Sequence, residues 1–235
     1  ILLIFEQTAV YEPGDFLIPF NTKNLIQSTE KIAVCLNQTF KKYNLPILIG
    51  IGGKGGSGKS EFSNLLIEHL DNSSIIRTDD YRQSRLVREK SKLLGSHPEA
   101  NKLDLLSTHI DLIKQGETFE KPVYDGKSGT DNNTEVYKPN RFNIIEGEMV
   151  CNDLVRMKVD YLIYITSSLL SQLVVRIKRD TMGRKNSLFK TMNVFLKSNL
   201  IDFRKFNHGC SDNAHTILKF RLISGFSIVL KNKLL

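Results

Sequence analysis

Apolar residues recur every three or four positions in several segments of the chain and run without interruption in others, so the pattern predicts both helices and strands. Between residues 22 and 43 the apolar positions follow the helical period, and Asn21-Thr22 offers an N-terminal cap. The same period marks residues 62–70, 103–113 and 169–177. Short, mainly apolar segments that we interpret as strands lie at residues 47–51, 75–77, 142–145, 161–165 and 226–230. Strands that alternate with helices predict an α/β fold, a mostly parallel sheet with helices on both faces.

Polar stretches and the less clearly patterned ends of the chain suggest how it is organised. Residues 125 to 134 are rich in Gly, Asn, Ser and Asp, which predicts a surface loop. Gly116 is placed to end the helix that begins near residue 103. We divide the chain into an N-terminal helical extension, residues 1–45, and one α/β domain, residues 46–235, whose last part from residue 190 has the weakest pattern.

A glycine-rich loop follows the apolar run at residues 47 to 51. It fits the pattern G-x-x-x-x-G-K-[ST] and leads into a helical segment. Such glycines let backbone N–H groups close around phosphate oxygens, while Lys59 supplies a cation and the Ser60 hydroxyl is a ligand for Mg²⁺. A flexible Gly/Ser linker would need neither the final Gly-Lys-Ser nor a strand in front. We therefore predict a loop that binds nucleotide phosphates through Gly53, Gly55, Gly56, Ser57, Gly58, Lys59 and Ser60.

Length and composition narrow the class of protein. With 235 residues, of which 40% are hydrophobic, the chain can bury a core. Its longest apolar run is far shorter than the roughly 20 residues that span a bilayer, and residues 1–5 lack the flanks of a signal peptide. We expect a cytoplasmic protein without a membrane segment. Cys35, Cys151 and Cys210 are odd in number and widely spaced, so we expect reduced thiols and neither a disulfide framework nor a zinc site.

The net charge of +8 is compatible with an anionic partner, and a nucleotide qualifies as readily as a nucleic acid. Much of the positive excess lies in residues 190–235, where no aromatic-interleaved binding motif accompanies it. We interpret this region as a solvated basic face and do not expect nucleic acid as a partner. The alternative, nucleic-acid binding through the same residues, predicts an affinity that falls steeply with salt.

Carboxylates follow two of the predicted strands. Asp79, Asp80 and Tyr81 come after the strand at residues 75–77, at the edge where ligands of open α/β sheets bind. One of these carboxylates could take the proton of an attacking hydroxyl or hold Mg²⁺ through water. The alternative is that Asp79 or Asp80 caps a helix. Glu146 ends another strand and is suited to the metal ion or its waters.

Basic residues follow the predicted helix that begins at residue 169. Arg176, Arg179 and Arg184 lie close in sequence, and the first two share a helix face because they are three positions apart. Such a pair can clamp a phosphate during its transfer. Taken alone, these arginines would be interpreted as an ordinary charged helix face.

One four-residue pattern favours a different class. Asn101-Lys102-Leu103-Asp104 fits N-K-x-D, the guanine-reading motif of GTPases, which act as switches. We reject this interpretation because no D-x-x-G stands between the loop and the pattern, and four residues with one free position match easily by chance.

The motifs occur in an order that resembles the uridine kinase-like branch of P-loop kinases, which includes phosphoribulokinase and bacterial pantothenate kinase. The resemblance covers about residues 47 to 187. Its motifs are the glycine-rich loop, Asp79-Asp80-Tyr81, His97-Pro98-Glu99-Ala100 with Leu105-Leu106, Lys121-Pro122-Val123-Tyr124-Asp125, Ile145-Glu146-Gly147 and Arg176-Ile177-Lys178-Arg179-Asp180. The resemblance implies a P-loop NTPase fold with a small lid that contains arginines, and ATP and Mg²⁺ as cofactors.

The resemblance also implies a role for each site residue. Asp79 is the base toward the acceptor hydroxyl, and the catalytic set is Asp79, Lys59, Arg179 and Arg184. Arg176 lies over the ATP phosphates and, with Asp79, Tyr81 and Tyr124, contacts the acceptor. Ser60 and Glu146 lie near the metal ion.

Several positions depart from the family pattern, and all of them concern the acceptor or the lid. Ser96 stands where uridine-cytidine kinases carry the Asp that grips the ribose diol, Arg82 replaces an aromatic residue, and Gly129 falls near a His that meets the pyrimidine. Asn186 aligns with the second Arg of the lid's Arg-Gly-Arg. Sites built on hydrogen bonds lose discrimination when a partner group is lost, so we expect an altered acceptor.

We therefore expect an ATP- and Mg²⁺-dependent kinase that phosphorylates a hydroxyl group of a small molecule. A kinase for a sugar, a vitamin or a sugar phosphate stays open, as does a nucleotide-binding regulatory module without turnover. Assembly into a homo-oligomer also stays open.

Overall fold

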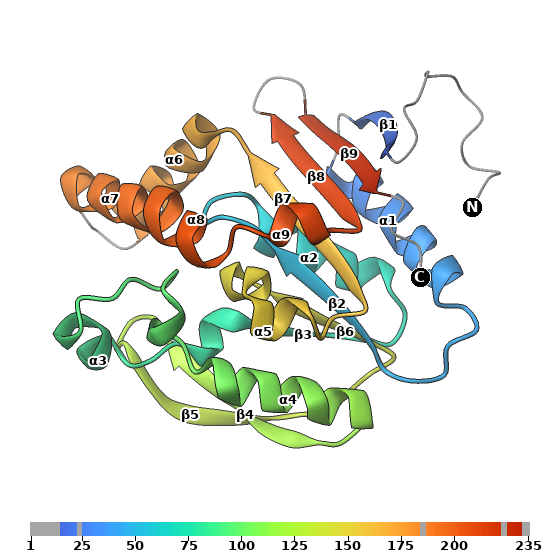
Figure 1. The fold of residues 1–235 in the computed structure, drawn as a ribbon, viewed down its shortest axis with the longest axis horizontal. Coiled ribbons are helices and arrows are strands. Elements are labelled where there is room, and N and C mark those ends of the chain that lie inside the picture. Colours follow the sequence, from blue (N-terminus) through green and yellow to red (C-terminus); the bar gives the residue numbers. More distant parts are fainter. Residues whose placement is uncertain (1–14, 23–24, 184–186, 222–224, 232–235) are drawn as a thin grey trace.

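A seven-stranded sheet runs through the computed structural model, which describes residues 15–22, 25–183, 187–221 and 225–231 (Figure 1). The strands lie in the order β1-β9-β8-β7-β2-β6-β3. Their bounds are β1 (Asp15–Thr22), β2 (Ile47–Gly52), β3 (Ser73–Arg77), β6 (Phe142–Glu146), β7 (Tyr161–Ser167), β8 (Thr216–Arg221) and β9 (Gly225–Lys231). The five strands from β8 to β3 are parallel. β9 pairs with β8 in the antiparallel direction, and β1 pairs with β9 in the antiparallel direction. The predicted α/β class with a mostly parallel sheet is confirmed.

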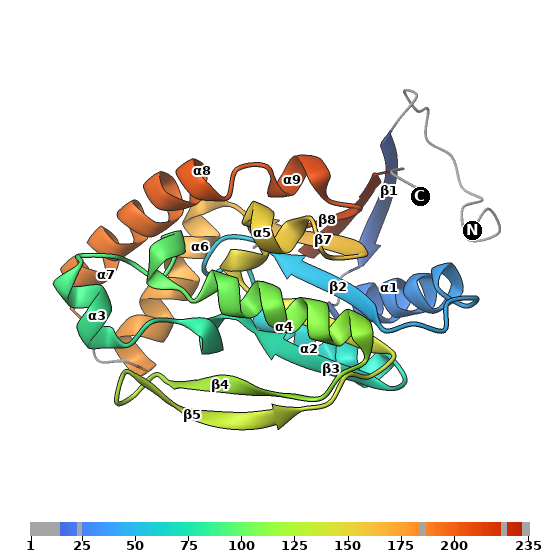
Figure 2. The same ribbon diagram turned by 60° about the horizontal axis from the view of Figure 1, so that its bottom comes forward.

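Helices cover both faces of the sheet, as predicted (Figure 2). The α-helices are α1 (Leu25–Thr39), α2 (Lys59–His69), α3 (Arg85–Lys90), α4 (Leu103–Gln115), α5 (Asp153–Arg156), α6 (Leu169–Ile177), α7 (Leu188–Phe195), α8 (Phe203–Phe206) and α9 (Cys210–Asn213). Short 3₁₀ turns are η2 (Thr78–Tyr81), η3 (Pro98–Ala100) and η4 (Glu148–Cys151), and wider π-turns are η5 (Lys178–Gly183) and η6 (Leu196–Asp202). Gly116 ends α4 in the left-handed region, with φ of 76°.

Two hydrophobic cores hold the helices against the sheet, one on each face. Along β2, Ile47, Ile49 and Ile51 point into the core that α1 and α2 cover, whereas Leu48 points into the core that α4 and α5 cover. All six residues of β2 are buried. A parallel strand buried on both faces needs apolar residues at successive positions, which explains the uninterrupted apolar runs in the sequence.

The segment predicted as a surface loop, residues 125–134, is mostly a hairpin. β4 (Phe119–Asp125) and β5 (Thr130–Tyr137) pair in the antiparallel direction, and only residues 126–129 connect them. The side chains of residues 133–136 are exposed. A hairpin with an exposed face can carry the polar composition of a loop, which is why the prediction was wrong for residues 130–134.

Residues before the glycine-rich loop belong to the same layers as the rest of the chain. β1 pairs with β9, and the buried residues of α1 join the core that α2 covers. The helix between residues 22 and 43 is confirmed as α1, although β1 and β8 were not predicted. The domain boundary near residue 45 stays a prediction. None of the helices in the described residues has the length and apolarity needed to cross a membrane.

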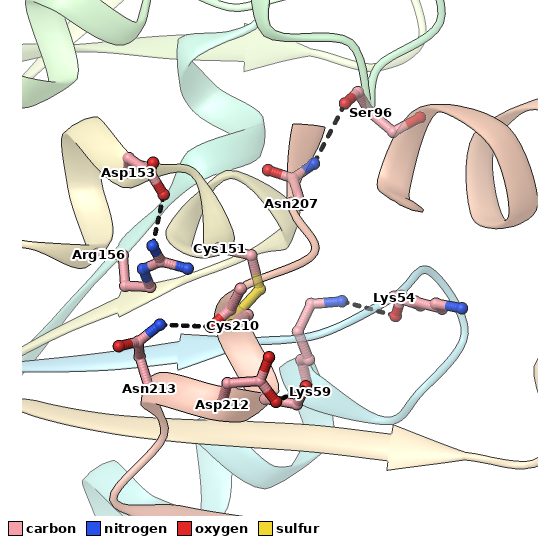
Figure 3. Close-up of a disulfide and its surroundings, with 12 residues drawn as sticks. Lys54, Lys59, Ser96, Cys151, Asp153, Arg156, Asn207, Cys210, Asp212 and Asn213 are labelled. Carbon is pink, nitrogen blue, oxygen red and sulfur yellow. Dashed lines mark hydrogen bonds and ion pairs between the residues drawn. A yellow bond between two sulfur atoms is a disulfide. The ribbon is translucent and has the colours of Figure 1, made fainter. Parts of the chain in front are cut away.

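Two of the three cysteines are joined, which contradicts the expectation of three reduced thiols. Cys151, at the end of η4, and Cys210, at the start of α9, form a disulfide (Figure 3), and Cys35 is outside it. The two are 59 residues apart in sequence, so their spacing gave no sign of the pairing. A Cβ on Gly52 would lie 2.7 Å and 2.8 Å from the two sulfur atoms, so the disulfide packs against the end of β2.

Candidate active site

Three neighbouring strands of the sheet end at the same edge, and each leads into a predicted site segment. In the register of the sheet, Glu146 of β6 lies beside Ile51 of β2 on one side and Arg77 of β3 on the other. The glycine-rich loop begins two residues after Ile51, and η2 follows Arg77 directly. The structure therefore brings the loop, Glu146 and Asp79 to one place, where parallel sheets bind ligands.

The glycine-rich loop has the conformation of a phosphate cradle. Gly56 and Gly58 have φ of 80° and 90°, which side chains other than glycine rarely adopt. A Cβ on Gly56 would also lie 2.7 Å from the carbonyl oxygen of Gln172. Among the described residues, no side chain caps the N-terminus of α2, so its first N–H groups are available to an anion. The Ser57 hydroxyl is buried and has no hydrogen-bond partner in the described residues.

Lys59, Ser60 and Glu146 form the polar floor of the site. The Lys59 ammonium donates to the carbonyl oxygen of Lys54 at 2.9 Å, and the Ser60 hydroxyl donates to Glu146 Oε1 at 3.3 Å. Burial raises the pKa of Glu146, and the nearby Lys59 ammonium works against this rise. A hydroxyl and a carboxylate at a phosphate loop are suitable ligands for Mg²⁺ or its waters. Within the described residues, no three His, Cys, Asp or Glu side chains form a metal cage, so these residues would hold the ion together with phosphates and water.

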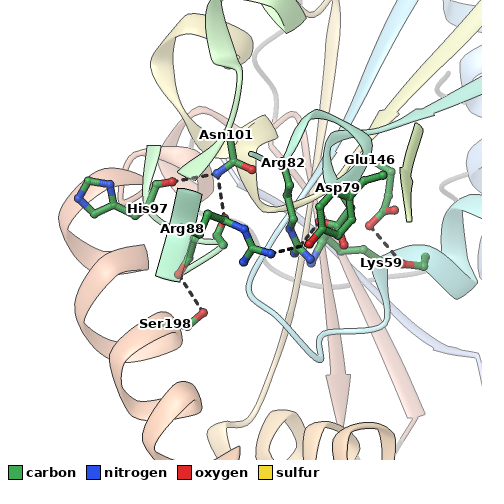
Figure 4. Close-up of polar contacts among 12 residues, drawn as sticks. Lys59, Asp79, Arg82, Arg88, His97, Asn101, Glu146 and Ser198 are labelled. Carbon is green, nitrogen blue, oxygen red and sulfur yellow. Dashed lines mark hydrogen bonds and ion pairs between the residues drawn. The ribbon is translucent and has the colours of Figure 1, made fainter. Parts of the chain in front are cut away.

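The structure separates the two adjacent carboxylates of η2. The Asp79 side chain is 58% exposed, and its Oδ1 lies 2.8 Å from Arg82 Nη2 (Figure 4). The Asp80 side chain is 20% exposed, and its Oδ2 lies 2.9 Å from the buried ammonium of Lys121. Neither carboxylate caps η2, whose N-terminus has no side-chain hydrogen bond. Asp79 is therefore the carboxylate that a substrate can reach.

The two predicted tyrosines have different surroundings. Tyr81 is fully buried in the core beside α4, and its hydroxyl lies 2.7 Å from His109 Nδ1. Burial raises the pKa of Tyr81 and lowers the pKa of His109. The structure does not bring Tyr81 to the site, so we leave it out of the acceptor contacts. The Tyr124 hydroxyl accepts a hydrogen bond from Arg88 Nη2 at 2.6 Å, and the Arg88 guanidinium lies over the Tyr124 ring.

Arg176, at the end of helix α6, is packed against the glycine-rich loop. Arg176 is only 8% exposed, and its Nη1 donates to Asn199 Oδ1 at 2.8 Å. Asn199 in turn donates to the carbonyl oxygen of Gly55 at 2.9 Å. An ordinary charged helix face would be solvated, so burial argues against that alternative for Arg176. Arg179 is 47% exposed and binds Asp180 at 2.9 Å, while the predicted Arg184 lies outside the described residues.

The buried and exposed faces of α6 are the reverse of what its apolar period suggests. Ser171, Gln172 and Arg176 are buried, whereas Leu170 and Val174 are exposed. The polar side chains face the glycine-rich loop, since Gln172 Oε1 accepts from Asn199 and the Gln172 backbone touches Gly56. Contact with a phosphate loop requires polar groups on this face, which the periodicity alone does not reveal.

Two further residues at the loop were not predicted. Glu148, at the start of η4, would lie 2.7 Å from a Cβ on Gly55, and Asn199 reaches the same glycine from η6. Glu148 follows a strand end by two residues, so the signal that identified Glu146 could have identified it too. Asn199 lies in a segment with no motif, so no sequence signal indicates its place at the loop.

Three positions singled out in the sequence have structural contacts. Ser96 is buried and donates to the Ser198 hydroxyl at 2.9 Å. Gly129 closes the turn between β4 and β5, with φ of 81°. Asn101, from the rejected N-K-x-D pattern, donates from Nδ2 to the carbonyl oxygens of Gly95 and His97 at 2.9 Å and 2.8 Å. Asn186 lies outside the described residues.

The sheet and the glycine-rich loop define a P-loop NTPase fold. Residues 48–222 match the model of the family described as "Phosphoribulokinase / Uridine kinase family", and the chain belongs to this family.

Relatives agree with the family assignment, and a solved structure agrees with the fold. The chain is 36% identical to the uridine kinase of Alkaliphilus metalliredigens over 160 residues, which cover 65% of this chain and 77% of the relative. It is 28% identical to the chloroplastic phosphoribulokinase of Triticum aestivum over 195 residues, 73% of this chain but only 48% of that relative. A solved structure from Silicibacter sp. TM1040, described as a candidate fructose transport system kinase, superposes with a TM-score of 0.62 at 17% identity, covering 81% of this chain and 92% of that one. At this identity the structure supports the fold alone.

Proposed function

We propose that the protein is a kinase that transfers the γ-phosphoryl group of ATP to a hydroxyl group of a small molecule, with Mg²⁺ as cofactor. One observation carries this proposal: the ends of β2, β6 and β3 bring a phosphate loop, a buried carboxylate and an accessible carboxylate together. A phosphate loop alone is shared by kinases, switches and motors. The accessible Asp79 beside it favours transfer to an acceptor, because such a transfer needs a group that takes the hydroxyl proton.

The residues of the loop would bind and neutralise the phosphates. Backbone N–H groups from Gly53 to Ser60 would bind the phosphate oxygens, and the Lys59 ammonium, which donates to the Lys54 carbonyl oxygen, would supply a positive charge to them. Ser60 and Glu146 would hold Mg²⁺, which supplies a positive charge against the developing charge on the phosphates. Arg176 in α6 and Arg179 in η5 would stabilise the negative charge that develops on the phosphates during the transfer.

On the acceptor side, Asp79 would accept the proton of the attacking hydroxyl. Asp80 is unsuited to this role because its carboxylate is already paired with Lys121. Phosphoryl transfer depends mainly on positioning and charge neutralisation, so an accessible carboxylate at the correct strand end is the chief protein requirement on this side.

The experiment is an acceptor panel. Purified protein with ATP and Mg²⁺ is assayed for ADP formation against ribonucleosides, pantothenate, glycerate, sugars and sugar phosphates. We expect acceptor-dependent ADP formation that the Asp79→Asn variant loses while it still binds ATP. Tight ATP binding without turnover on any acceptor would instead support a nucleotide-binding regulatory module.

A further inference from the structure

Arg82 directs its guanidinium at the proposed catalytic carboxylate from a position that three contacts define. Its Nη2 lies 2.8 Å from Asp79 Oδ1, and its backbone forms an isolated antiparallel bridge with Asn101 (Figure 4). A Cβ on Gly95 would lie 3.1 Å from Arg82 Nε and 3.2 Å from Nη2, so the glycine leaves room for the guanidinium. The Arg82 side chain is 22% exposed. The residue is held in place at the acceptor side and does not extend freely into solvent.

The Arg82 guanidinium has hydrogen-bonding capacity that the protein does not use. A guanidinium carries five N–H donors, and the Nε of Arg82 is buried without a hydrogen-bond partner in the described residues. An unpaired buried donor is unfavourable and calls for an explanation. Burial alone would lower the pKa of Arg82, but the carboxylates of Asp79 and Glu148 outweigh it, and the pKa is raised. Arg82 is therefore a permanent cation.

A second guanidinium lies on the same side of the site. Arg88 donates to the Tyr124 hydroxyl at 2.6 Å, and its guanidinium lies over the Tyr124 ring. Arg82 and Arg88 thus place two guanidinium groups on the side of the site where Asp79 lies, and a guanidinium group is a suitable partner for an anionic group of a ligand.

We infer that the acceptor carries a carboxylate or phosphate group in addition to the hydroxyl that is phosphorylated, and that Arg82 binds this anionic group. The inference rests on the proposed function. Guanidinium groups bind carboxylates and phosphates through two parallel N–H···O bonds, and a single bond to Asp79 leaves that capacity open.

The same contact explains how Asp79 becomes available as a base. In the structure the Asp79 carboxylate is paired with Arg82. An anionic acceptor takes over the guanidinium, and the released carboxylate accepts the proton of the acceptor hydroxyl. The hydroxyl oxygen then forms a bond to the γ-phosphorus as the bond to the β–γ bridging oxygen breaks, and ADP leaves. A neutral acceptor leaves the ion pair in place.

Matched acceptor pairs test the inference by binding. Glycerate is compared with glycerol, and a pentose phosphate with the free pentose, each titrated into protein saturated with Mg²⁺ and a non-hydrolysable ATP analogue. We expect at least one anionic member to bind about tenfold or more tightly than its neutral partner, as a charge-assisted bond implies. The glycerate arm reports a carboxylate ligand and the pentose arm a phosphate ligand.

Variants assign the preference to Arg82. In Arg82→Gln we expect the anionic member to lose about 10- to 100-fold in affinity, while the affinity for the ATP analogue changes by less than about threefold. Arg82→Lys should restore part of the preference because it restores the charge. The matched control is Arg85→Ala, since Arg85 carries the same charge in the same segment but donates to the carbonyl oxygens of Gly126 and Lys127.

Two results would overturn the inference: equal affinity for both members of every pair, or a preference that survives Arg82→Gln. If the Arg82→Gln variant lost more affinity for the ATP analogue than for the acceptor, Arg82 would be assigned to ATP binding, and this result would also overturn the inference. Turnover is measured separately on the same pairs. A binding preference for the anionic member without phosphoryl transfer would support the anion site and contradict the proposed function. Phosphoryl transfer to neutral acceptors alone would support the proposed function and contradict the anion site.

Discussion

Asp79 and Asp80 are neighbours in sequence, but their surroundings predict that exchanging each for Asn has opposite effects on activity and stability. Asp79 is the exposed partner of Arg82, and Asp80 is the less exposed partner of the buried Lys121. Both exchanges remove one charge and change the side-chain volume little. The two variants are therefore controls for each other.

For Asp79→Asn we expect a large loss of rate and a small loss of stability. A general base contributes about 10²- to 10⁴-fold, so the barrier should rise by about 3–5 kcal/mol. The ion pair with Arg82 involves a carboxylate that is 58% exposed, and pairs of this kind contribute at most about 1 kcal/mol. The affinity for ATP should stay within about threefold, because Asp79 lies on the acceptor side.

For Asp80→Asn we expect the reverse. The Lys121 ammonium is 4% exposed and retains Glu135 at 2.6 Å, so it loses one of two partners. The cost should be about 1–3 kcal/mol in the free energy of unfolding. Turnover per folded molecule should change by less than about tenfold, since Asp80 is not a reacting group.

Urea unfolding curves give the stabilities, and a coupled assay of ADP formation gives kcat and KM for both variants. A rate loss in Asp80→Asn as large as that in Asp79→Asn would refute the assignment of the base. So would an Asp79→Asn protein that keeps its rate.

Three further predictions follow from buried groups. The Tyr81→Phe variant should lower the free energy of unfolding by about 1–3 kcal/mol, because His109 loses a buried hydrogen bond. Its KM for the acceptor should stay unchanged. A raised KM would show that Tyr81 contacts the acceptor. Burial raises the pKa of Glu146, so ionisation of this carboxyl lowers the free energy of unfolding as the pH rises. The Glu146→Gln variant should therefore be more stable than the parent at neutral pH. In acid, where Glu146 is protonated, the difference in stability should vanish. The same variant should need about 10- to 100-fold more Mg²⁺ for ATP binding. Unchanged Mg²⁺ dependence and unchanged stability would contradict the proposal that Glu146 is a buried group near the metal ion. Thiol titration of the denatured, unreduced protein should detect Cys35 but not Cys151 or Cys210; three reactive thiols would contradict the disulfide.

Much of the central sheet could be predicted because its strands are buried on both faces. Such strands favour apolar residues at successive positions, as in β2 and the first five residues of β7, whereas β6 also contains the buried Asn143. The β4–β5 hairpin was missed in part because its exposed side chains have the composition of a loop. β1 joins the sheet only through pairing with β9, which comes from the other end of the chain. Such a long-range pairing has no local signal.

In the candidate site, too, some residues could be predicted from local sequence patterns and others could not. Lys59, Ser60, Asp79 and Glu146 were predicted from loops at strand ends, and parallel strands bring those ends together whatever lies between them. Contacts between segments that are distant in the sequence could not be predicted from strand ends. Asn199 reaches the phosphate loop through tertiary packing, with nothing in its own segment to indicate it.

The central claim is that this protein moves the γ-phosphoryl group of ATP to an acceptor hydroxyl, and its most direct measurement follows that group. ATP labelled in the γ-phosphoryl group is incubated with the protein, Mg²⁺ and the acceptor panel, and the products are separated. The account predicts label on a hydroxyl of one acceptor, in an amount equal to the ADP formed, and none with Asp79→Asn. Label that stays in ATP with every acceptor, or appears only as free phosphate, would contradict it.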